Sequence, residues 1–149
     1  MDNLITPSNL FKVANFIALI SWALLILVPK NKLTKKLVSS GYASLLLSIG
    51  YWLALITMTI DAIPSGAGFQ TLEGVRLFFT SEWGLLAGWI HYLAFDLLIG
   101  TAVESRLQNR NFAIRAFCLF MIFMLGPVGW SFSKLFKAKE QNGISPSAI

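Results

Sequence analysis

Long apolar stretches separated by short clusters of positive charge dominate the pattern of hydrophobic and polar positions along this chain. A helix needs about 20 consecutive apolar residues to cross the hydrocarbon core of a bilayer. Four stretches meet that requirement, at residues 10–28, 37–60, 83–101 and 112–132. The pattern therefore predicts an all-α, polytopic membrane protein. We expect one membrane domain over residues 1–149, containing a four-transmembrane-helix bundle and ending in a basic polar tail at residues 133–149.

The loop between the second and third stretches differs from the others. Pro64, Gly66 and Gly68 prevent a continuous helix there. The sequence TLEGVRLFFTSE that follows has apolar residues at helical spacing, with Glu73 and Arg76 between them. This pattern predicts a short amphipathic helix between the second and third spanning helices, anchored at the membrane interface. The alternative is a lid that contributes Glu73 and Arg76 to a pocket.

The glycines and prolines of the last stretch predict a change of direction. Gly126, Pro127 and Gly129 lie close together near its end, and they indicate a kink in the fourth spanning helix. Trp130 follows and is expected to anchor the helix at the interface.

Composition agrees with a membrane protein and excludes other classes. Of the 149 residues, 56% are hydrophobic and 13% are charged, whereas a soluble domain has about 25% charged residues. The mean hydropathy is +0.67. The net charge of +5 lies beside the ends of apolar stretches, where it orients the helices and meets anionic lipid head groups rather than nucleic acid. Cys118 is the only cysteine, so an internal disulfide is excluded.

The distribution of Lys and Arg predicts the orientation. Four crossings would put both termini on the same side. The first and third loops hold Lys30, Lys32, Lys35, Lys36, Arg106, Arg110 and Arg115. The opposite side holds Lys12, Arg76, Lys134, Lys137 and Lys139. The positive-inside rule then places both termini outside. The first nine residues show no signal or plastid transit pattern, so we expect a bacterial plasma membrane or a thylakoid-type membrane.

The segment GWIHYLAFDLLIGT at residues 88–101 concentrates the polar chemistry. It holds the only histidine, His91, and the only acid well inside a stretch, Asp96. A charge at this depth costs about 2.5–3.5 kcal/mol, so Asp96 is expected to be functional or to be neutralised by Tyr92, a serine or Asn15. Because His91 and Asp96 are about 140° apart on a helix, they cannot pair directly, but they can line two walls of one pocket.

Several kinds of chemistry are excluded. One histidine cannot build a multi-histidine iron or zinc centre, and we predict no metal site. The chain has no P-loop, dinucleotide-binding or nucleophile-elbow motif. Proton chemistry or binding without chemistry remains. Five Trp and twelve Phe would give an aromatic pocket that suits a long apolar ligand taken from the lipid.

This segment resembles the signature of the small membrane proteins of the abscisic-acid-deficient-four type, which are required for neoxanthin synthesis in plants and have bacterial and cyanobacterial relatives. Three further pieces share the resemblance: FKVANFIALISWALLILVPKNKLTKK at residues 11–36, LEGVRLFF at 72–79 and FCLFMIFMLGPVGW at 117–130. The resemblance implies an integral membrane carotenoid-modifying enzyme. Two reactions are open: isomerisation of an epoxy-xanthophyll to an allenic one, or oxidative, light-dependent cleavage of β-carotene to retinal-like products.

The resemblance also implies roles for particular residues. Asp96 would transfer protons, with His91 or Glu73 as its complement. The expected substrate-binding residues are Trp89, Tyr92, Phe95, Asn15, Trp22, Arg76 and Trp52. No cofactor is predicted beyond a bound carotenoid, and the expected partners are membrane lipids, a second copy of the chain or a partner carotenoid enzyme. Two alternatives are a non-catalytic carotenoid-binding or assembly protein and a small transporter.

Overall fold

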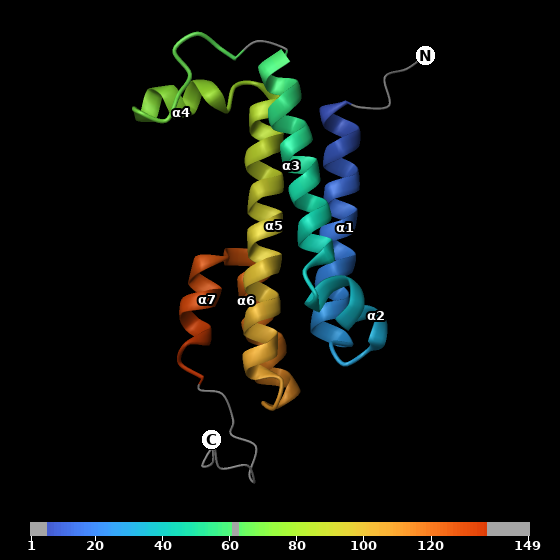
Figure 1. Ribbon diagram of the computed structural model, residues 1–149. Helices are drawn as coiled ribbons and strands as arrows, with labels where there is room; N and C mark the ends of the chain where they lie inside the picture. The colour runs from blue at the N-terminus through green and yellow to red at the C-terminus, as the bar shows by residue number, and fades with distance from the viewer. Residues whose placement is uncertain (1–5, 61–62, 137–149) are drawn as a thin grey trace, which may run out of the picture.

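The computed structural model describes residues 6–60 and 63–136, and within those ranges every regular element is helical (Figure 1). The elements in chain order are α1 (Pro7–Leu27), α2 (Lys32–Thr34), a π-helical turn (Lys35–Ser39), α3 (Tyr42–Ile60), α4 (Leu72–Phe78), α5 (Glu82–Leu107), α6 (Phe112–Leu125) and α7 (Pro127–Ser133). The expected all-α class is confirmed for this part of the chain. Most of the predicted polar tail lies outside the described residues.

α5 is the central helix of the bundle, and it packs against α1, α3, α6 and α7. In the most apolar part of α5, 56% of the residues are buried, against 28% in the corresponding parts of the two other long helical segments. Three segments of the described chain are long and apolar enough to cross a membrane: Pro7–Leu27, Lys32–Ile60 and Glu82–Leu107. These segments correspond to the first three predicted spans.

Small residues fill the contacts between the helices, and large apolar residues point outward. The buried set includes Ala14, Ala18, Ala54, Ala87 and Ala94. Such residues let helix backbones approach closely inside a bilayer. The exposed set on α1 and α3 includes Phe16, Leu19, Leu45, Ile49, Trp52 and Ile56. A surface of this kind is suited to lipid chains.

The short helix expected after the second span is present as α4, and it lies beside one end of α5 (Figure 1). The Thr71 side chain caps it by accepting a hydrogen bond from the backbone N–H of Gly74. Phe78 packs against the core of the bundle, and the ring of Phe79 lies against the backbone of α5 at Gly88.

The last two helices form an antiparallel hairpin on the side of α5 (Figure 1). Gly129 of α7 lies so close to α6 that a side chain there would overlap the backbone of Met121 and Ile122. The rings of Phe117 and Phe132 are 5.4 Å apart between centroids, although 15 residues of continuous helix would span about 22 Å. The chain therefore turns back at Gly126.

The hairpin corrects one prediction and leaves a second without support. Residues 112–132 do not form one continuous spanning helix, because the chain reverses at Gly126 where the sequence predicted only a kink. A four-helix crossing is therefore not confirmed. The described chain begins with α1 at one end of the bundle and finishes with α7 at the opposite end. The expectation that both termini share a side depended on the fourth crossing, and it is not supported.

Candidate functional site

The hairpin places its tip beside the carboxyl group of Asp96, near the middle of α5. Asp96 is 6% exposed, and its Oδ2 atom has no hydrogen-bond partner among the described residues. A Cβ atom at Gly126 would lie 2.8 Å from Oδ1 and 2.9 Å from Oδ2. The backbone of Gly126 also has a φ of 41°, a value that side-chain-bearing residues rarely adopt. The carboxyl group thus lies directly against the helix break.

Tyr92, one turn before Asp96, completes the polar group at this break. In a continuous helix the carbonyl of Phe123 would accept a hydrogen bond from the backbone nitrogen of residue 127. That residue is Pro127, which has no N–H to donate. The hydroxyl of Tyr92 donates to the Phe123 carbonyl instead, at 3.3 Å. This contact satisfies a backbone group that lipid would leave unpaired.

Irregular backbone inside a membrane protein is tolerated only where protein or a cavity surrounds it, and in transporters such breaks mark binding sites. Here Gly126 is buried, and the break brings together a carboxyl group, a phenolic hydroxyl and a carbonyl. The group is small, deep and surrounded by apolar residues. It can donate or accept a proton, and it can hydrogen-bond a polar group on an otherwise apolar ligand.

His91 has different neighbours from Asp96. Its imidazole stacks on Phe95, with centroids 4.6 Å apart, and meets Tyr51 of α3 edge-on at 5.5 Å. It lines a recess of about 420 Å³ among α3, α5 and the α4 segment. The two residues predicted to line two walls of one pocket therefore lie at separate positions along α5.

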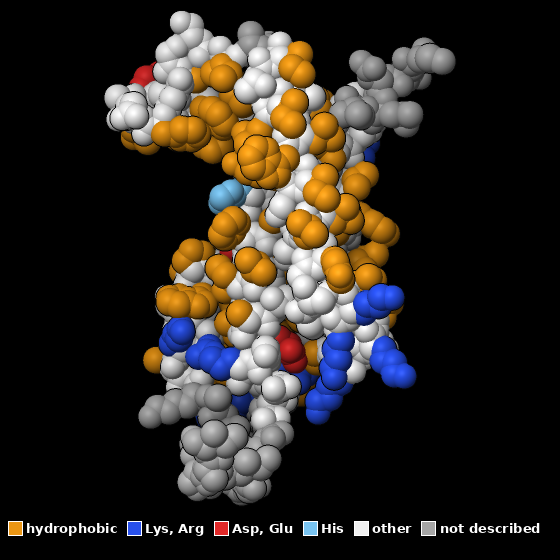
Figure 2. Space-filling view, viewed as in Figure 1, with side chains coloured by type: hydrophobic (Ala, Val, Ile, Leu, Met, Phe, Trp, Pro, Cys, Tyr) orange, Lys and Arg blue, Asp and Glu red, His pale blue; other side chains and the backbone are white. Residues whose placement is uncertain are grey.

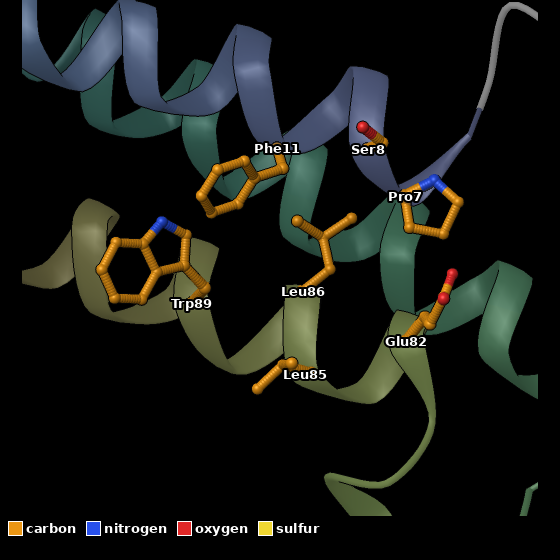
Figure 3. Close-up of a pocket in the computed structure, with 7 residues that line it drawn as sticks. All are labelled: Pro7, Ser8, Phe11, Glu82, Leu85, Leu86 and Trp89. Carbon is orange, nitrogen blue, oxygen red and sulfur yellow. The ribbon is translucent and has the colours of Figure 1, made fainter.

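A second recess lies between α1 and α5 (Figure 3). Phe11 and Trp89 face each other across it, with Glu82 near its end, and its volume is about 360 Å³. The indole N–H of Trp89 donates to Oδ1 of Asn15 at 3.2 Å. A smaller recess of about 220 Å³ continues from Trp89 to Tyr92 and Phe123. An apolar groove thus leads from one end of the bundle toward the helix break.

The remaining predicted residues are distributed between the core and the surface. Trp22 is buried against Gly100, and its ring lies 5.5 Å from that of Phe123. Trp52 is 63% exposed on α3. The structure therefore brings Asn15, Trp89 and Tyr92 to one groove. Asp96 lies one turn beyond Tyr92 and, like Trp52, lines none of these three recesses.

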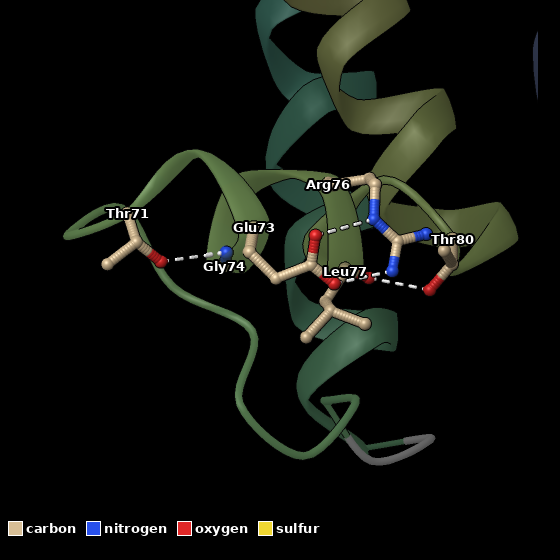
Figure 4. A network of polar contacts seen from close by, with 6 residues as sticks. All are labelled: Thr71, Glu73, Gly74, Arg76, Leu77 and Thr80. Atoms are coloured by element: carbon tan, nitrogen blue, oxygen red, sulfur yellow. Dashed lines mark hydrogen bonds and ion pairs between the residues drawn. The ribbon is translucent and has the colours of Figure 1, made fainter.

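Glu73 and Arg76 bind each other rather than a pocket (Figure 4). The guanidinium Nε donates to the carboxylate of Glu73 at 2.8 Å, and a second hydrogen bond makes the pair bidentate. Both side chains are more than half exposed. Arg76 lowers the pKa of Glu73, and Glu73 raises the pKa of Arg76. A carboxylate stabilised in its charged form in this way is poorly suited to supplying a proton near neutral pH.

Several residues of the site were not predicted from the sequence. Gly126 and Pro127 were recognised only as a kink, and Phe123, Tyr51, Phe79 and Gly88 were not predicted to line a pocket. The Gly-Pro pair is a local signal for a break, but the partner that a break faces is set by packing between distant segments. Among the described residues, no group of three or more His, Cys, Asp or Glu side chains lies close enough to hold a metal ion.

The chain is similar to a known protein family and to a curated plant protein. The sequence model of the ABA DEFICIENT 4-like family matches residues 9–132. The chain is 29% identical over 114 residues to Protein ABA DEFICIENT 4, chloroplastic, of Arabidopsis thaliana. That alignment covers 70% of this chain and 52% of the relative, so the chain spans about half the length of the curated relative it matches. No solved structure matches the chain.

Proposed function

The chain belongs to the ABA DEFICIENT 4-like family, and from this membership we propose that it is an integral membrane protein that modifies a carotenoid taken from the lipid phase. The family match confirms the resemblance found in the sequence. Support for the ligand class comes from the two apolar, aromatic recesses beside α5. A long polyene has the shape and the polarity that such recesses accept.

The proposed arrangement in the membrane has three crossing helices and one hairpin that enters from a single side. α6 has 14 residues and covers about 21 Å, which is less than the roughly 30 Å hydrocarbon core. The hairpin therefore reaches into the bilayer without crossing it. The tip of the hairpin places Gly126 beside Asp96. The carboxyl group of Asp96 then lies at the depth of the bilayer that a lipid-dissolved ligand occupies.

The observation that carries the proposed activity is the buried carboxyl group of Asp96 at the helix break. We propose that it transfers protons in an isomerisation of an epoxidised carotenoid ring. Asp96 gives a proton to the epoxide oxygen as one C–O bond breaks. The adjacent carbon of the polyene then returns a proton to the carboxylate, and its C–H electron pair forms the second double bond of an allene. The formula of the carotenoid is unchanged and the carboxyl group is regenerated.

Tyr92 is placed to assist this step. Its hydroxyl is one turn from Asp96 and is held by the carbonyl of Phe123. The first step requires the protonated form of Asp96. Glu73 is not assigned a part in the reaction, because Arg76 already binds it at the edge of the molecule.

The test is pigment analysis with an Asp96→Asn variant. The full chain is expressed in bacteria that accumulate epoxidised xanthophylls or β-carotene, and extracted pigments are compared by chromatography in light and in darkness. Because general acid–base catalysis contributes about 10²–10⁴-fold, we expect the variant to form at least 100-fold less product while pigment still co-purifies with it. The matched control is Glu104→Gln, which changes a second buried acid of α5 outside the break.

Three results would contradict the proposal. Equal product from the Asp96→Asn variant would remove Asp96 from the reaction. Pigment that binds without conversion in both proteins would indicate a binding or assembly protein. Products that are shorter than the substrate and appear only in light would indicate oxidative cleavage instead of isomerisation.

A further inference from the structure

Two apolar recesses between α1 and α3 form one groove along the surface of the bundle. The larger recess has a volume of about 260 Å³ and lies toward the end of α1 and the start of α3. The smaller recess, of about 170 Å³, continues toward the start of α1. Both recesses are lined by Ile17 and Leu46. This α1–α3 groove therefore extends along α1 from Leu10 to Leu24.

The larger recess has a buried floor and bulky walls. Its lining includes Ser21, Val38 and Ala43, which are all buried. The hydroxyl of Ser21 donates to the Ile17 carbonyl of its own helix at 2.7 Å, so its hydrogen is already paired. The exposed side chains on either side of this floor are Phe16, Ile20, Leu37, Tyr42 and Leu46. A slot of this kind suits a hydrocarbon chain.

The length of the α1–α3 groove suits one leaflet of a bilayer. The helix from Leu10 to Leu24 is about 21 Å long. The hydrocarbon part of one leaflet is about 15 Å deep, which is half of the roughly 30 Å core. A single acyl chain can therefore follow the groove through the whole depth of its leaflet.

One end of the groove meets a turn that carries four lysines. Lys30, Lys32, Lys35 and Lys36 lie in the connection between α1 and α3, and all four are exposed. Positive side chains are visible at this end of α1 and α3 (Figure 2). Leu37, which directly follows Lys36, already lines the groove. Positive charge and apolar surface therefore meet at this lysine turn, which comprises residues 30–36.

Hydrogen bonds fix the backbone of the lysine turn. The buried hydroxyl of Thr34 donates to the Val28 carbonyl at 2.9 Å. The side chain of Asn31 accepts a hydrogen bond from the backbone N–H of Leu33 at 2.8 Å. The π-helical turn at Lys35–Ser39 follows, a conformation that is rare and is found frequently at functional sites. The backbone that carries the lysines is therefore ordered beside the groove before any ligand binds.

The acids of the described chain balance these lysines only in part. Glu104 of α5 interacts electrostatically with Lys30 and Lys35. Neither Lys32 nor Lys36 forms an ion pair with a described residue. The lysine turn therefore has an excess of positive charge that an anion can balance.

We propose that the α1–α3 groove and the lysine turn together bind one anionic phospholipid. The phosphate lies among the lysines, chiefly Lys32 and Lys36, and one acyl chain lies along the groove. Basic pockets between membrane-spanning helices bind anionic lipid head groups. A zwitterionic lipid carries a cation beside its phosphate, and lysines repel that cation. The site therefore selects anionic over zwitterionic lipid, and one molecule per chain saturates it.

This lipid site is separate from the proposed carotenoid chemistry. The α1–α3 groove shares no lining residue with the recesses that Trp89, Tyr92 and His91 line. A lipid held there does not occupy the space of a ligand beside α5. The inference goes beyond the proposed function, and either of the two can fail without the other.

The experiment measures thermal unfolding of the full chain in detergent during titration with lipid. The probes are phosphatidylglycerol, phosphatidylcholine with the same acyl chains, and inorganic phosphate. A ligand that binds only the folded state raises the melting temperature, and the titration gives its dissociation constant. The wild type should bind phosphatidylglycerol about tenfold more tightly than phosphatidylcholine. Inorganic phosphate should cause no shift, and native mass spectrometry should show one phosphatidylglycerol per chain.

Two pairs of lysine substitutions test the head-group contacts. Lys32→Gln combined with Lys36→Gln should abolish the preference for phosphatidylglycerol. The matched control combines Lys12→Gln with Lys134→Gln, which removes the same charge at exposed positions outside the lysine turn. The control should keep the preference of the wild type. Because all four positions are exposed, both double variants should fold.

A third variant tests the groove itself. Ala43→Leu fills part of its floor and should weaken the binding of phosphatidylglycerol, whereas Ala23→Leu adds the same side chain at an exposed position of α1 outside the groove and should bind like the wild type. Equal affinity of the wild type for the two lipids, or an equal loss in both lysine pairs, would overturn the inference. An equal shift with inorganic phosphate would also overturn it, and so would unchanged binding by Ala43→Leu.

Discussion

Gly126 meets two requirements at the scale of a single residue. Its φ of 41° lies in a region that costs a residue with a side chain about 1–3 kcal/mol. Its missing side chain also leaves room for Asp96, whose carboxyl carbon would lie 3.2 Å from a Cβ atom there. The backbone requirement and the packing requirement are separate, so they can be measured separately.

The first residue-scale prediction compares Gly126→Ala with Gly41→Ala. Gly41 also has a positive φ, of 87°, but no atom lies within 4 Å of the position of its Cβ. Both variants should lose about 1–3 kcal/mol for the backbone, and only Gly126→Ala should lose more because it pushes against Asp96. Thermal unfolding in detergent measures the difference.

A double-mutant cycle identifies the cause. If the additional loss comes from the carboxyl group, adding Asp96→Ala to Gly126→Ala should recover it, and adding Asp96→Ala to Gly41→Ala should not. Equal losses in the two glycine variants, or no recovery in the double variant, would mean that the carboxyl group does not press on the break.

At the scale of secondary-structure elements, the sequence predicts α1, α3 and α5 because each contains enough consecutive apolar residues to span a bilayer. The length of each apolar stretch is sufficient for that prediction. The sequence predicts α4 because apolar residues at helical spacing follow the break made by Pro64, Gly66 and Gly68. The direction taken after Gly126 depends on contacts that no local pattern contains. Gly129 must fit against Ile122, and Arg106 must reach the carbonyl of Ser133, at 3.0 Å.

The same limit applies to the site. The neighbours Tyr92 and Asp96 could be predicted, because they lie one turn apart on one helix. The salt bridge between Glu73 and Arg76 follows from spacing of the same kind. The contact of Asp96 with Gly126, and the hydrogen bond from Tyr92 to Phe123, join α5 to a hairpin 30 residues later in the chain. Only the reversal of α7 and the fit of α6 against α5 create them.

A disulfide experiment tests the hairpin. Phe117→Cys and Phe132→Cys are combined in a Cys118→Ala background, and the rings they replace are 5.4 Å apart. Oxidation should cross-link the hairpin nearly completely. In a continuous helix the two positions would be about 22 Å apart and no intramolecular disulfide would form. Protease cleavage between the two sites, followed by electrophoresis with and without reductant, distinguishes these outcomes.

The control pair is Phe117→Cys with Val128→Cys. Val128 is exposed and lies at the start of α7, beside the tip of the hairpin and away from Phe117. This pair should stay reduced in either arrangement. Cross-linking of both pairs to the same extent would indicate loose chains rather than a packed hairpin.

At the scale of the whole molecule, the hairpin rearranges the positive charges (Figure 2). The ends of α1, α5 and α7 lie at one end of the described molecule, where Figure 2 shows most of the Lys and Arg side chains. The residues in or beside these helix ends are Lys30, Lys32, Lys35, Lys36, Arg106, Arg110, Arg115 and Lys134. Lys12 and Arg76 belong to the other end. With a fourth crossing, Lys134 would join the smaller set and the asymmetry would be weak. With the hairpin, the charge difference between the two ends is large, and the positive-inside rule predicts an orientation that can be tested.

The last prediction is that the start of α1 faces outward and the end of α7 faces the cytoplasm. Ser8→Cys and Leu135→Cys are made singly in the Cys118→Ala background, at exposed positions in the first turn of α1 and just after α7. In intact bacterial cells, a membrane-impermeant thiol reagent should label Ser8→Cys at once and Leu135→Cys only after permeabilisation. Four crossings would instead place both positions on one side, so that both are labelled or both are protected. The assay therefore tests the orientation and the hairpin together, and a shared response of the two positions would rule out a hairpin that returns to the side it entered from.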